Sequence, residues 1–451
     1  MRKNLKINTG RSLFVVLATI FVAGFYIYVL SPKASGQEKV SLSGLSETLS
    51  DLIQDEKGLL RESGQTGLFK LGETKSRLSE DEKSSIASVS ESEISFNLTS
   101  LSEIDSERLS FPLPDGKVHV AVKRKTEGIE YRGKRDFTWR GKLEEEGLSG
   151  DVILTFTDGS VSGLIYSGNT VYEIVSKGGR QILVELDQSR FPGCAGEIKS
   201  DEFEFETKGF EFETKSEVTT ENNITAEDTG NTIDVLVLYT NNVKNSLGGD
   251  TQARNFAQQA IDSTNTAYIN SRITQRVRLV RAQQSPIGEA GSLSTELSNL
   301  RSNSSVTNLR NQYNADLVAM ISNTNDGCGI GYLMGSTSGN ANNAFTVTSR
   351  TCAVGNLSFA HELGHNMGSA HNPENGSGGT YSYSFGHWVN GVFRTVMSYS
   401  NPCTSGCTRV AYFSNPSVNY SSRPTGTSSR DNARSINNTD VTIANYRSGG
   451  N

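Results

Sequence analysis

Three of the chain's five histidines lie in the segment Ser358–His371, at spacings that suit a metal ion. Residues four apart lie on one face of a helix, so His361 and His365 can direct their imidazoles at one ion. A helix continued to His371 would carry that ring roughly 15 Å beyond His361, so the helix must end first. Gly368 permits this break, because glycine adopts positive φ without strain. Three neutral imidazoles with an open fourth position are typical of catalytic zinc.

Glu362 follows the first of these histidines and lies about 100° round the helix from it, where it can hold a water rather than bind the metal. Zinc lowers the pKa of its bound water to about 7 and polarises a carbonyl group, which makes hydroxide available at neutral pH. Glu362 would accept the water's proton and pass it to the leaving amine. The segment therefore predicts hydrolysis of peptide bonds in proteins or peptides, with one Zn²⁺ as cofactor. The sequence leaves calcium binding open.

Two other functions are compatible with a zinc motif. One is a catalytically idle, zinc-stabilised surface-binding protein, although such a protein has no use for Glu362 as a base. The other is a zinc amidase that acts on cell-wall material. Digestion of peptides, lost with a zinc chelator and with Glu362→Gln, distinguishes a peptidase from both.

The full pattern His-Glu-x-x-His-x-x-Gly-x-x-His, followed by Thr-Val-Met-Ser-Tyr at 395–399, resembles the metzincin clan of zinc metallopeptidases. Residues 232–448, which include Cys-Gly-Ile-Gly-Tyr-Leu-Met at 328–334, are similar to the bacterial peptidyl-Asp metalloendopeptidases and reprolysin-like secreted proteases. The resemblance implies a zincin-like fold, with Met397 in the Met-turn beneath the metal. It also implies that Tyr399 approaches the zinc or the oxyanion, as in astacin- and serralysin-type members, and that cleavage occurs next to acidic residues.

The N-terminal residues have the pattern of an export signal. Four basic residues precede an uncharged run, residues 12–32, which approaches the roughly 20 residues that span a bilayer. Residues 1–36 are therefore predicted to be a signal peptide or an uncleaved membrane anchor. The rest of the protein is expected to be secreted and extracellular, with membrane contact only through that anchor.

Export permits disulfide bonds among the four cysteines of the second half of the chain. Three connectivities are possible, and the local one pairs Cys328 with Cys352 and Cys403 with Cys407. The fifth cysteine, Cys194, stands between glycines in Pro-Gly-Cys-Ala-Gly.

Flanking glycines let an extended backbone approach a cleft closely, and a thiolate is a good zinc ligand. We therefore expect a cysteine switch, as in reprolysin-type zymogens. In this arrangement Cys194 occupies the fourth position on the zinc, so that the protein's own propeptide inhibits it until the leader is cut. A buried or intermolecular cysteine is the alternative.

Composition suggests four further parts after the signal or anchor. Residues 37–107, rich in Ser, Glu and Lys, are expected to be a low-order charged leader. Residues 108–199 contain strand patterns separated by Asp-Gly and Gly-Gly turns, which predicts a β-rich propeptide domain. Residues 200–230 are an acidic linker with a direct repeat of Phe-Glu-Phe-Glu-Thr-Lys. Residues 231–451 alternate strands with helices, which predicts an α/β catalytic domain with a mixed, mostly parallel sheet and an active-site helix.

Charge is distributed unevenly between the halves. The net charge is −6, with an excess of ten acidic residues up to Gly230 and an excess of four basic residues after it. No basic field covers the whole chain, so nucleic acid is not expected as a partner.

Overall fold

The structure is a computed structural model of the chain, in two units, Met1–Gln65 and Thr66–Asn451. In the first unit, β1 (Leu5–Thr9), β2 (Ser12–Phe21) and β3 (Gly24–Leu30) form an antiparallel sheet. No helix in the described part of the chain is long and apolar enough to cross a membrane. The export signal stays a prediction, and the linker 200–230 lies outside the described residues. The structure describes residues 5–9, 12–21, 24–30, 67–96, 107–133, 135–145, 150–199 and 232–447.

A ten-stranded antiparallel sheet, which we call the β domain, forms the N-terminal part of the second unit. Its order is β4-β5-β13-β12-β11-β10-β9-β7-β6, and β8 pairs with β9. Two hairpins turn at Asp158-Gly159 and Gly178-Gly179, where all four residues have the positive φ that tight hairpins require. The predicted β-rich region is confirmed. Its elements are β4 (Phe69–Lys75), η1 (Glu80–Glu82), β5 (Ser88–Phe96), β6 (Arg108–Pro112), β7 (Val118–Lys123), β8 (Ile129–Tyr131), β9 (Phe137–Leu143), β10 (Asp151–Thr157), β11 (Ser160–Ser167), β12 (Thr170–Lys177) and β13 (Arg180–Leu186).

Strands β4 and β5 come from the stretch that composition assigned to the charged leader, residues 37–107. Most buried residues of β5 are polar, among them Ser88, Ser90 and Ser92, and Ile94 is its one buried large apolar residue. Ser90 donates a hydrogen bond to Glu185 on β13 at 2.8 Å. Hydrogen-bonded hydroxyls can be buried at little cost, so a serine-rich strand still joins the sheet. The folded β domain thus begins well before the predicted boundary at residue 107.

The C-terminal part of the second unit is built on a six-stranded mixed sheet of order β14-β18-β19-β17-β15-β16. Strand β18 runs antiparallel to β19, and all other neighbours in this sheet are parallel, as predicted. Successive residues of β15 point to opposite faces. Accordingly, Val235 and Val237 join one hydrophobic cluster, and Leu236 and Leu238 join another.

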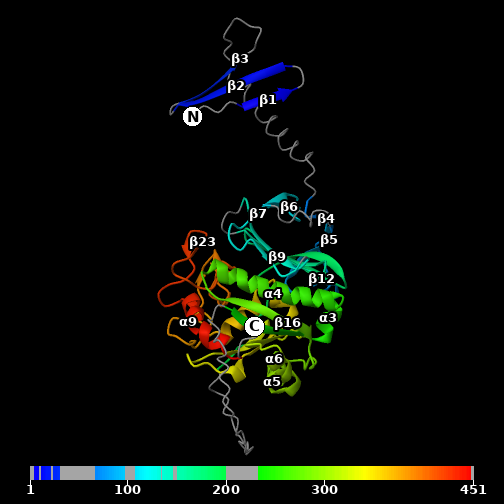
Figure 1. Ribbon diagram of the computed structural model, residues 1–451, viewed down its shortest axis with the longest axis vertical. Coiled ribbons are helices and arrows are strands. Elements are labelled where there is room, and N and C mark those ends of the chain that lie inside the picture. Colours follow the sequence, from blue (N-terminus) through cyan, green and yellow to red (C-terminus); the bar gives the residue numbers. More distant parts are fainter. Residues whose placement is uncertain are drawn as a thin grey trace, which may run out of the picture. The chain divides into compact units, whose positions relative to one another are not determined.

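Helices cover both faces of this mixed sheet. α4 (Asp250–Asn270) and α8 (Ser358–Asn366) share the cluster of Val235, whereas α5 (Leu293–Ser302) and α6 (Ser304–Gln312) share the cluster of Leu236. α4 also contacts β10 and β11, so it lies between the β domain and the mixed sheet (Figure 1). The other elements are β14 (Glu197–Lys199), β15 (Thr232–Tyr239), α3 (Asn241–Leu247), β16 (Arg276–Gln284), β17 (Leu317–Ser322), β18 (Gly329–Leu333), η2 (Ala341–Asn343), β19 (Phe345–Ser349), α7 (Arg350–Ala353), β20 (Trp388–Val389), β21 (Phe393–Arg394), β22 (Thr408–Arg409), β23 (Asn419–Tyr420), β24 (Arg423–Pro424) and α9 (Asn432–Ala444).

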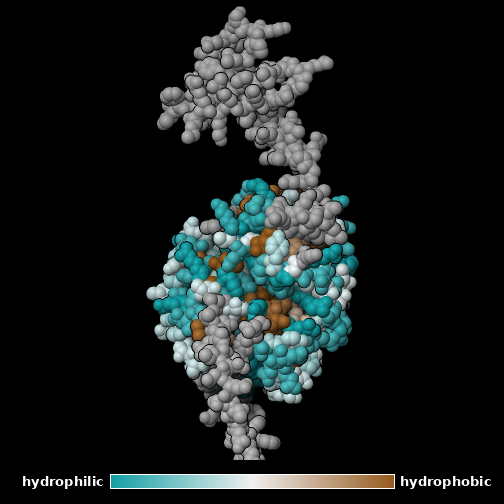
Figure 2. Space-filling view, viewed as in Figure 1, coloured by the Kyte–Doolittle hydropathy of each residue, from teal (hydrophilic) through white to brown (hydrophobic). Residues whose placement is uncertain are grey.

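The face of the second unit seen in Figure 2 is mostly hydrophilic, and apolar residues reach it in small groups. Most large apolar side chains are buried in the clusters of the two sheets.

Candidate metal centre

Helix α8 carries the first two motif histidines and ends where the sequence predicts. Met367 is its C-cap, and Gly368 follows with φ +82°. A Cβ atom at Gly368 would lie only 2.0 Å from Oγ1 of Thr380, so a side chain does not fit there. The chain turns at this glycine and brings His371 back to the helix.

The three imidazoles converge on one point. Nε2 of His371 lies 3.1 Å from Nε2 of His361 and 3.1 Å from Nε2 of His365. All three residues are buried. Burial lowers the pKa of His365 to about 4 and that of His371 to about 2, and burial together with His365 holds the pKa of His361 well below its usual value. The rings are therefore neutral at pH 7.

Hydrogen bonds on the far side of two rings fix their tautomers. Nδ1 of His361 donates to the carbonyl oxygen of Val396, and Nδ1 of His365 donates to that of Ser369, both at 2.9 Å. Because a carbonyl oxygen only accepts, each Nε2 presents a lone pair to the centre of the cluster. Such lone pairs repel unless a cation lies between them, and imidazoles held in this way are the usual metal-ligating form. The cluster therefore fits a metal ion.

Cys194 supplies a fourth possible ligand. The ligand atoms of Cys194 and the three histidines all lie within 4.8 Å of one another. Sγ of Cys194 lies 3.2 Å from the carbonyl oxygen of Gly329 and 3.2 Å from Oε1 of Glu362, and either oxygen can accept the single thiol proton. Burial and the charge of Glu362 raise the pKa of the Cys194 thiol well above its usual value, so the thiol keeps its proton unless a cation is bound.

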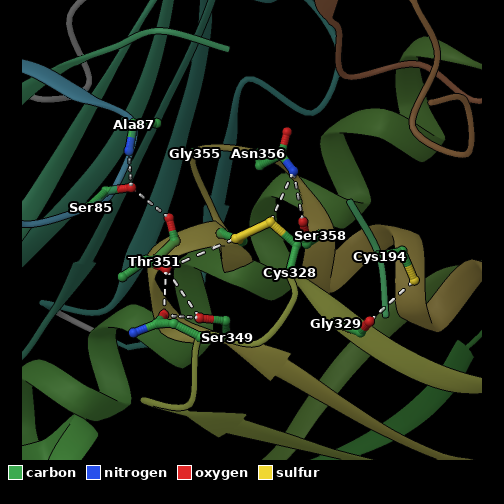
Figure 3. The surroundings of a disulfide bond; sticks show 12 residues. Ser85, Ala87, Cys194, Cys328, Gly329, Ser349, Thr351, Gly355, Asn356 and Ser358 are labelled. Atoms are coloured by element: carbon green, nitrogen blue, oxygen red, sulfur yellow. Dashed lines mark hydrogen bonds between the residues drawn. A yellow bond between two sulfur atoms is a disulfide. The ribbon is translucent and has the colours of Figure 1, made fainter. Parts of the chain in front are cut away.

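The segment around Cys194 pairs with the strand at the edge of the cluster. The amide of Cys328 donates to the carbonyl oxygen of Gly193 at 2.9 Å, and the amide of Ala195 donates to that of Gly329 at 2.8 Å. Strand β14 continues this pairing, parallel to β18. Figure 3 shows Cys194 beside Gly329, next to the Cys328–Cys352 disulfide. Residues 197–199 thus pair with the mixed sheet, although the prediction grouped them with the β domain.

Glu362 is fully buried, and its carboxylate lies beside the thiol of Cys194. A Cβ atom on Gly329 would lie 2.5 Å from its Oε1, so the carboxylate needs a glycine on β18. Sequence reasoning missed Gly329. Its importance emerges only when β18 is packed against α8, and the local sequence carries no signal for that contact.

Met397 and Tyr399 flank the cluster. Met397 is buried against α8, where a Cβ atom on Gly364 would lie 2.6 Å from its Sδ. The Tyr399 ring centroid is 4.4 Å from that of His371, and its hydroxyl donates to the carbonyl oxygen of Cys194 at 3.4 Å. Both side chains thus lie beside the cluster.

Both local disulfides are formed, Cys328–Cys352 and Cys403–Cys407. The first ties the start of β18 to α7, next to the N-terminal end of α8. Cys194 is the only free cysteine among the described residues.

Comparison with known proteins agrees with this geometry. Residues 229–414 match Reprolysin_5, metallo-peptidase family M12. A peptidyl-Asp metalloendopeptidase of Xanthomonas campestris pv. campestris is 30% identical over 356 residues, which cover 74% of this chain and 80% of that protein. One of Stenotrophomonas maltophilia (strain R551-3) is 31% identical over 313 residues, 66% of this chain and 70% of that protein. A solved structure described as a chaperone-substrate complex covers 48% of this chain and 36% of its own, at 22% identity and a TM-score of 0.39, which is too slight a likeness to define the fold.

Convergent histidines on a broken helix, with a carboxylate beside them, suit a metal-dependent hydrolase. The family match and the relatives define the class as a metalloendopeptidase. The chain belongs to metallo-peptidase family M12, and bacterial peptidyl-Asp metalloendopeptidases are among its relatives.

Proposed function

We propose that this chain is an exported zinc endopeptidase, made as a zymogen, that cleaves peptide bonds next to acidic residues. The observation that carries the proposal is the pairing of an extended segment, residues 193–199, with β18 beside the histidine cluster. Main-chain hydrogen bonds to an edge strand are a common way to hold an extended peptide. A peptide substrate would use the same edge once this segment has left.

His361, His365 and His371 would hold the zinc. Three neutral imidazoles and one exchangeable position suit catalytic zinc, whereas a structural zinc site is closed by four protein ligands. When bound, Zn²⁺ would lower the pKa of a water to about 7 and polarise the carbonyl group of the peptide.

Glu362 is the general base and then the general acid. Its Oε1 lies 3.2 Å from Sγ of Cys194. Once the thiol has left, this carboxylate oxygen would lie beside the group that replaces the thiol. The carboxylate would accept the proton of the attacking water and return it to the leaving amine. The Tyr399 hydroxyl, which reaches the carbonyl oxygen of Cys194, would donate to the negative charge that develops on the substrate carbonyl.

Latency rests on Cys194 as the fourth zinc ligand and on the β domain as the propeptide. The β domain and α4 belong to one hydrophobic cluster, and several polar side chains of α4 also contact the β domain. Asp262 of α4 accepts hydrogen bonds from Thr138 and Thr155 at 2.5 Å each, and Asn270 of α4 donates to Asp151 at 3.0 Å. Such a helix face can meet water after the propeptide is removed.

Export rests on residues 1–36 as a signal peptide or anchor, and two disulfide bonds suit an oxidising compartment outside the cytoplasm. The acidic substrate preference rests on the names of the relatives, which are peptidyl-Asp enzymes.

The position of Glu362 disfavours an idle surface-binding protein, and the extended peptide along β18 favours a peptide over a cell-wall amide as substrate.

The test uses the full chain, cut within residues 200–230 by limited proteolysis and separated from the released β domain. This matured enzyme should digest peptides, lose activity with a chelator and regain it with Zn²⁺. Glu362→Gln should retain the metal and lower kcat by about 10²–10⁴-fold. A matured enzyme that digests no peptide, or a fully active Glu362→Gln, would overturn the proposal.

Latency is tested on the uncut precursor. Cys194→Ala should show peptidase activity above that of the uncut wild type, because the fourth position is then open to solvent. A Cys194→Ala precursor that stays silent would argue against thiol ligation.

A further inference from the structure

Two buried arginines lie side by side near the histidine cluster. β21 and β22 pair in parallel, and Arg394 is the register partner of Arg409. These residues are only 3% and 5% exposed. Two positive charges are thus held next to each other away from water.

Both guanidinium groups bind the same two residues. Nη1 of Arg394 and Nη2 of Arg409 donate to the carbonyl oxygen of Ser398 at 3.0 and 3.2 Å. Nη2 of Arg394 donates to Oδ1 of Asn356 at 3.3 Å, and Nη1 of Arg409 donates to the carbonyl oxygen of Asn356 at 2.9 Å. Ser398 precedes Tyr399, and Asn356 lies just before α8. The pair therefore joins two segments that border the cluster.

Neither arginine is paired with a carboxylate in the described part of the chain. The Nε atoms of both are buried without a hydrogen-bond partner. Burial and Arg409 hold the pKa of Arg394 well below its usual value, and burial lowers the pKa of Arg409 to about 10. Unpaired buried charges are costly and are typical of functional sites.

Arg409 also lies near the cluster. Its guanidinium donates to the carbonyl oxygen of Ser398, and the next residue, Tyr399, has its ring centroid 4.4 Å from that of His371. The arginine pair is therefore close to the place where the peptide bond would be cleaved.

The β domain covers the pair. Tyr166 of β11 has a buried hydroxyl on which the charges of both arginines act. Thr408, next to Arg409, donates to the carbonyl oxygen of Asn169 in the β11–β12 turn at 3.2 Å. A cavity of about 490 Å³ lies between this turn and the segment with Ser400 and Thr408. Thr408, next to Arg409, lines this cavity, so removal of the β domain would open the space beside Arg409.

We propose that Arg394 and Arg409 bind the side-chain carboxylate of the substrate residue next to the cleaved bond, and that the β11–β12 hairpin covers this site in the zymogen. The inference rests on the proposed function. A guanidinium holds a carboxylate with two parallel N–H donors, and the Nε atoms are available for such a fork. A site built for a charged group rejects a substrate without that group, because the arginines then stay unpaired. Selectivity for Asp over Asn follows.

The test compares peptides of one sequence that differ only by Asp or Asn at one position, cleaved by the matured enzyme. Wild type should cleave the Asp peptide with kcat/KM at least about 100-fold above that of the Asn peptide, at a bond of that residue. Arg394→Gln and Arg409→Gln should each reduce this ratio by about tenfold or more, since each removes charged hydrogen bonds to the carboxylate. The ratio should fall because kcat/KM for the Asp peptide decreases, whereas kcat/KM for the Asn peptide changes little.

Arg310→Gln is the matched control. Arg310, on α6, is also buried and donates to backbone carbonyl oxygens, those of Ala315, Asp316 and Ala341, but it lies outside the cluster. Its replacement should lower the melting temperature and leave the Asp/Asn ratio unchanged. An equal fall of the ratio in Arg310→Gln would overturn the assignment.

An Arg394 or Arg409 variant with the wild-type ratio would also overturn the inference and leave the proposed function intact. A wild-type enzyme that cleaves no peptide would instead overturn the proposed function.

If the variants do not fold, wild type supplies the test through phenylglyoxal, a reagent for arginine. N-acetylaspartate amide should protect Arg394 and Arg409 from modification, as located by mass spectrometry, and N-acetylasparagine amide should not. Equal modification with both compounds, or no modification of this pair, would refute the site.

Discussion

Replacement of Gly329 by alanine perturbs the position of Glu362 directly. The new Cβ atom would lie 2.5 Å from Oε1 and 2.7 Å from Cγ of Glu362, whereas heavy atoms in contact ordinarily lie about 3.5 Å apart or more. β18 cannot move away freely, because it pairs with β19 and the disulfide at Cys328 holds its start. The Glu362 side chain must therefore shift by about 1 Å.

The size of that shift sets the expected loss of activity. A misplacement of about 1 Å costs about 100-fold in rate, which corresponds to about 2.7 kcal/mol in activation free energy. We expect kcat of matured Gly329→Ala to fall by about 100-fold, with a small change in KM. The three histidines are untouched by the substitution, so the metal content should stay at the wild-type level.

Gly331→Ala is the control, two residues further along the same strand. Its Cβ atom would lie 3.1 Å from Cγ2 of Thr346, 3.2 Å from the carbonyl oxygen of Glu362 and 3.4 Å from Oε2 of Glu362, which is tight but needs no large movement. Its kcat should stay within a few-fold of wild type. Initial rates on a fluorogenic peptide give kcat and KM, metal analysis gives the metal content, and thermal melting gives the stability of each variant. A Gly329→Ala enzyme with wild-type kcat and metal content would refute the role of Glu362 as a positioned base.

The domain interface and the histidine cluster should also respond to pH and to loss of charge. Glu173 of β12 lies against Gly355, and burial raises its pKa from 4.5 to about 8. Because the folded precursor then holds a proton that the unfolded chain releases, its stability should fall between about pH 4.5 and pH 8. The Glu173→Gln precursor should melt several degrees above wild type at pH 9 and at the same temperature as wild type at pH 4. Identical melting curves of variant and wild type at both pH values would contradict this. Asp262→Ala, which leaves two buried threonine hydroxyls without their acceptor, should destabilise the precursor by about 3 kcal/mol in urea titrations. A loss below about 1 kcal/mol would show that this interface contact is weak. Burial lowers the pKa of His365 to about 4, so metal affinity of the matured enzyme should be nearly constant from pH 8 to pH 5 and fall near pH 4, and a midpoint near 6.5 would contradict the buried, neutral cluster.

The histidine cluster was predictable because its geometry is local. Helical periodicity fixes His361 and His365 on one face, and a glycine three residues after the second histidine marks the turn that returns His371. The glycines around Cys194 likewise indicated a backbone that approaches a cleft, and the structure brings its thiol to the cluster.

Features that depend on packing between distant segments were not predictable. Gly329 is needed only because β18 lies on α8, and its own neighbours in sequence do not reveal that contact. Arg394 and Arg409 reach residues 38 and 53 positions away in the chain, and nothing in the local pattern separates a buried arginine from a surface one. The strand β5 was missed for a related reason, since its buried face carries serines and its composition resembles that of a solvated segment.

The central claim is that one Zn²⁺ lies between three imidazoles and that Cys194 fills its fourth position until maturation. X-ray absorption at the zinc edge, measured on the uncut full chain, reports those ligands directly. The account predicts three nitrogens at about 2.0–2.1 Å and one sulfur at about 2.3 Å, with the sulfur lost both in the matured enzyme and in Cys194→Ala. A precursor that binds no zinc, or a sulfur ligand that persists in Cys194→Ala, would contradict it.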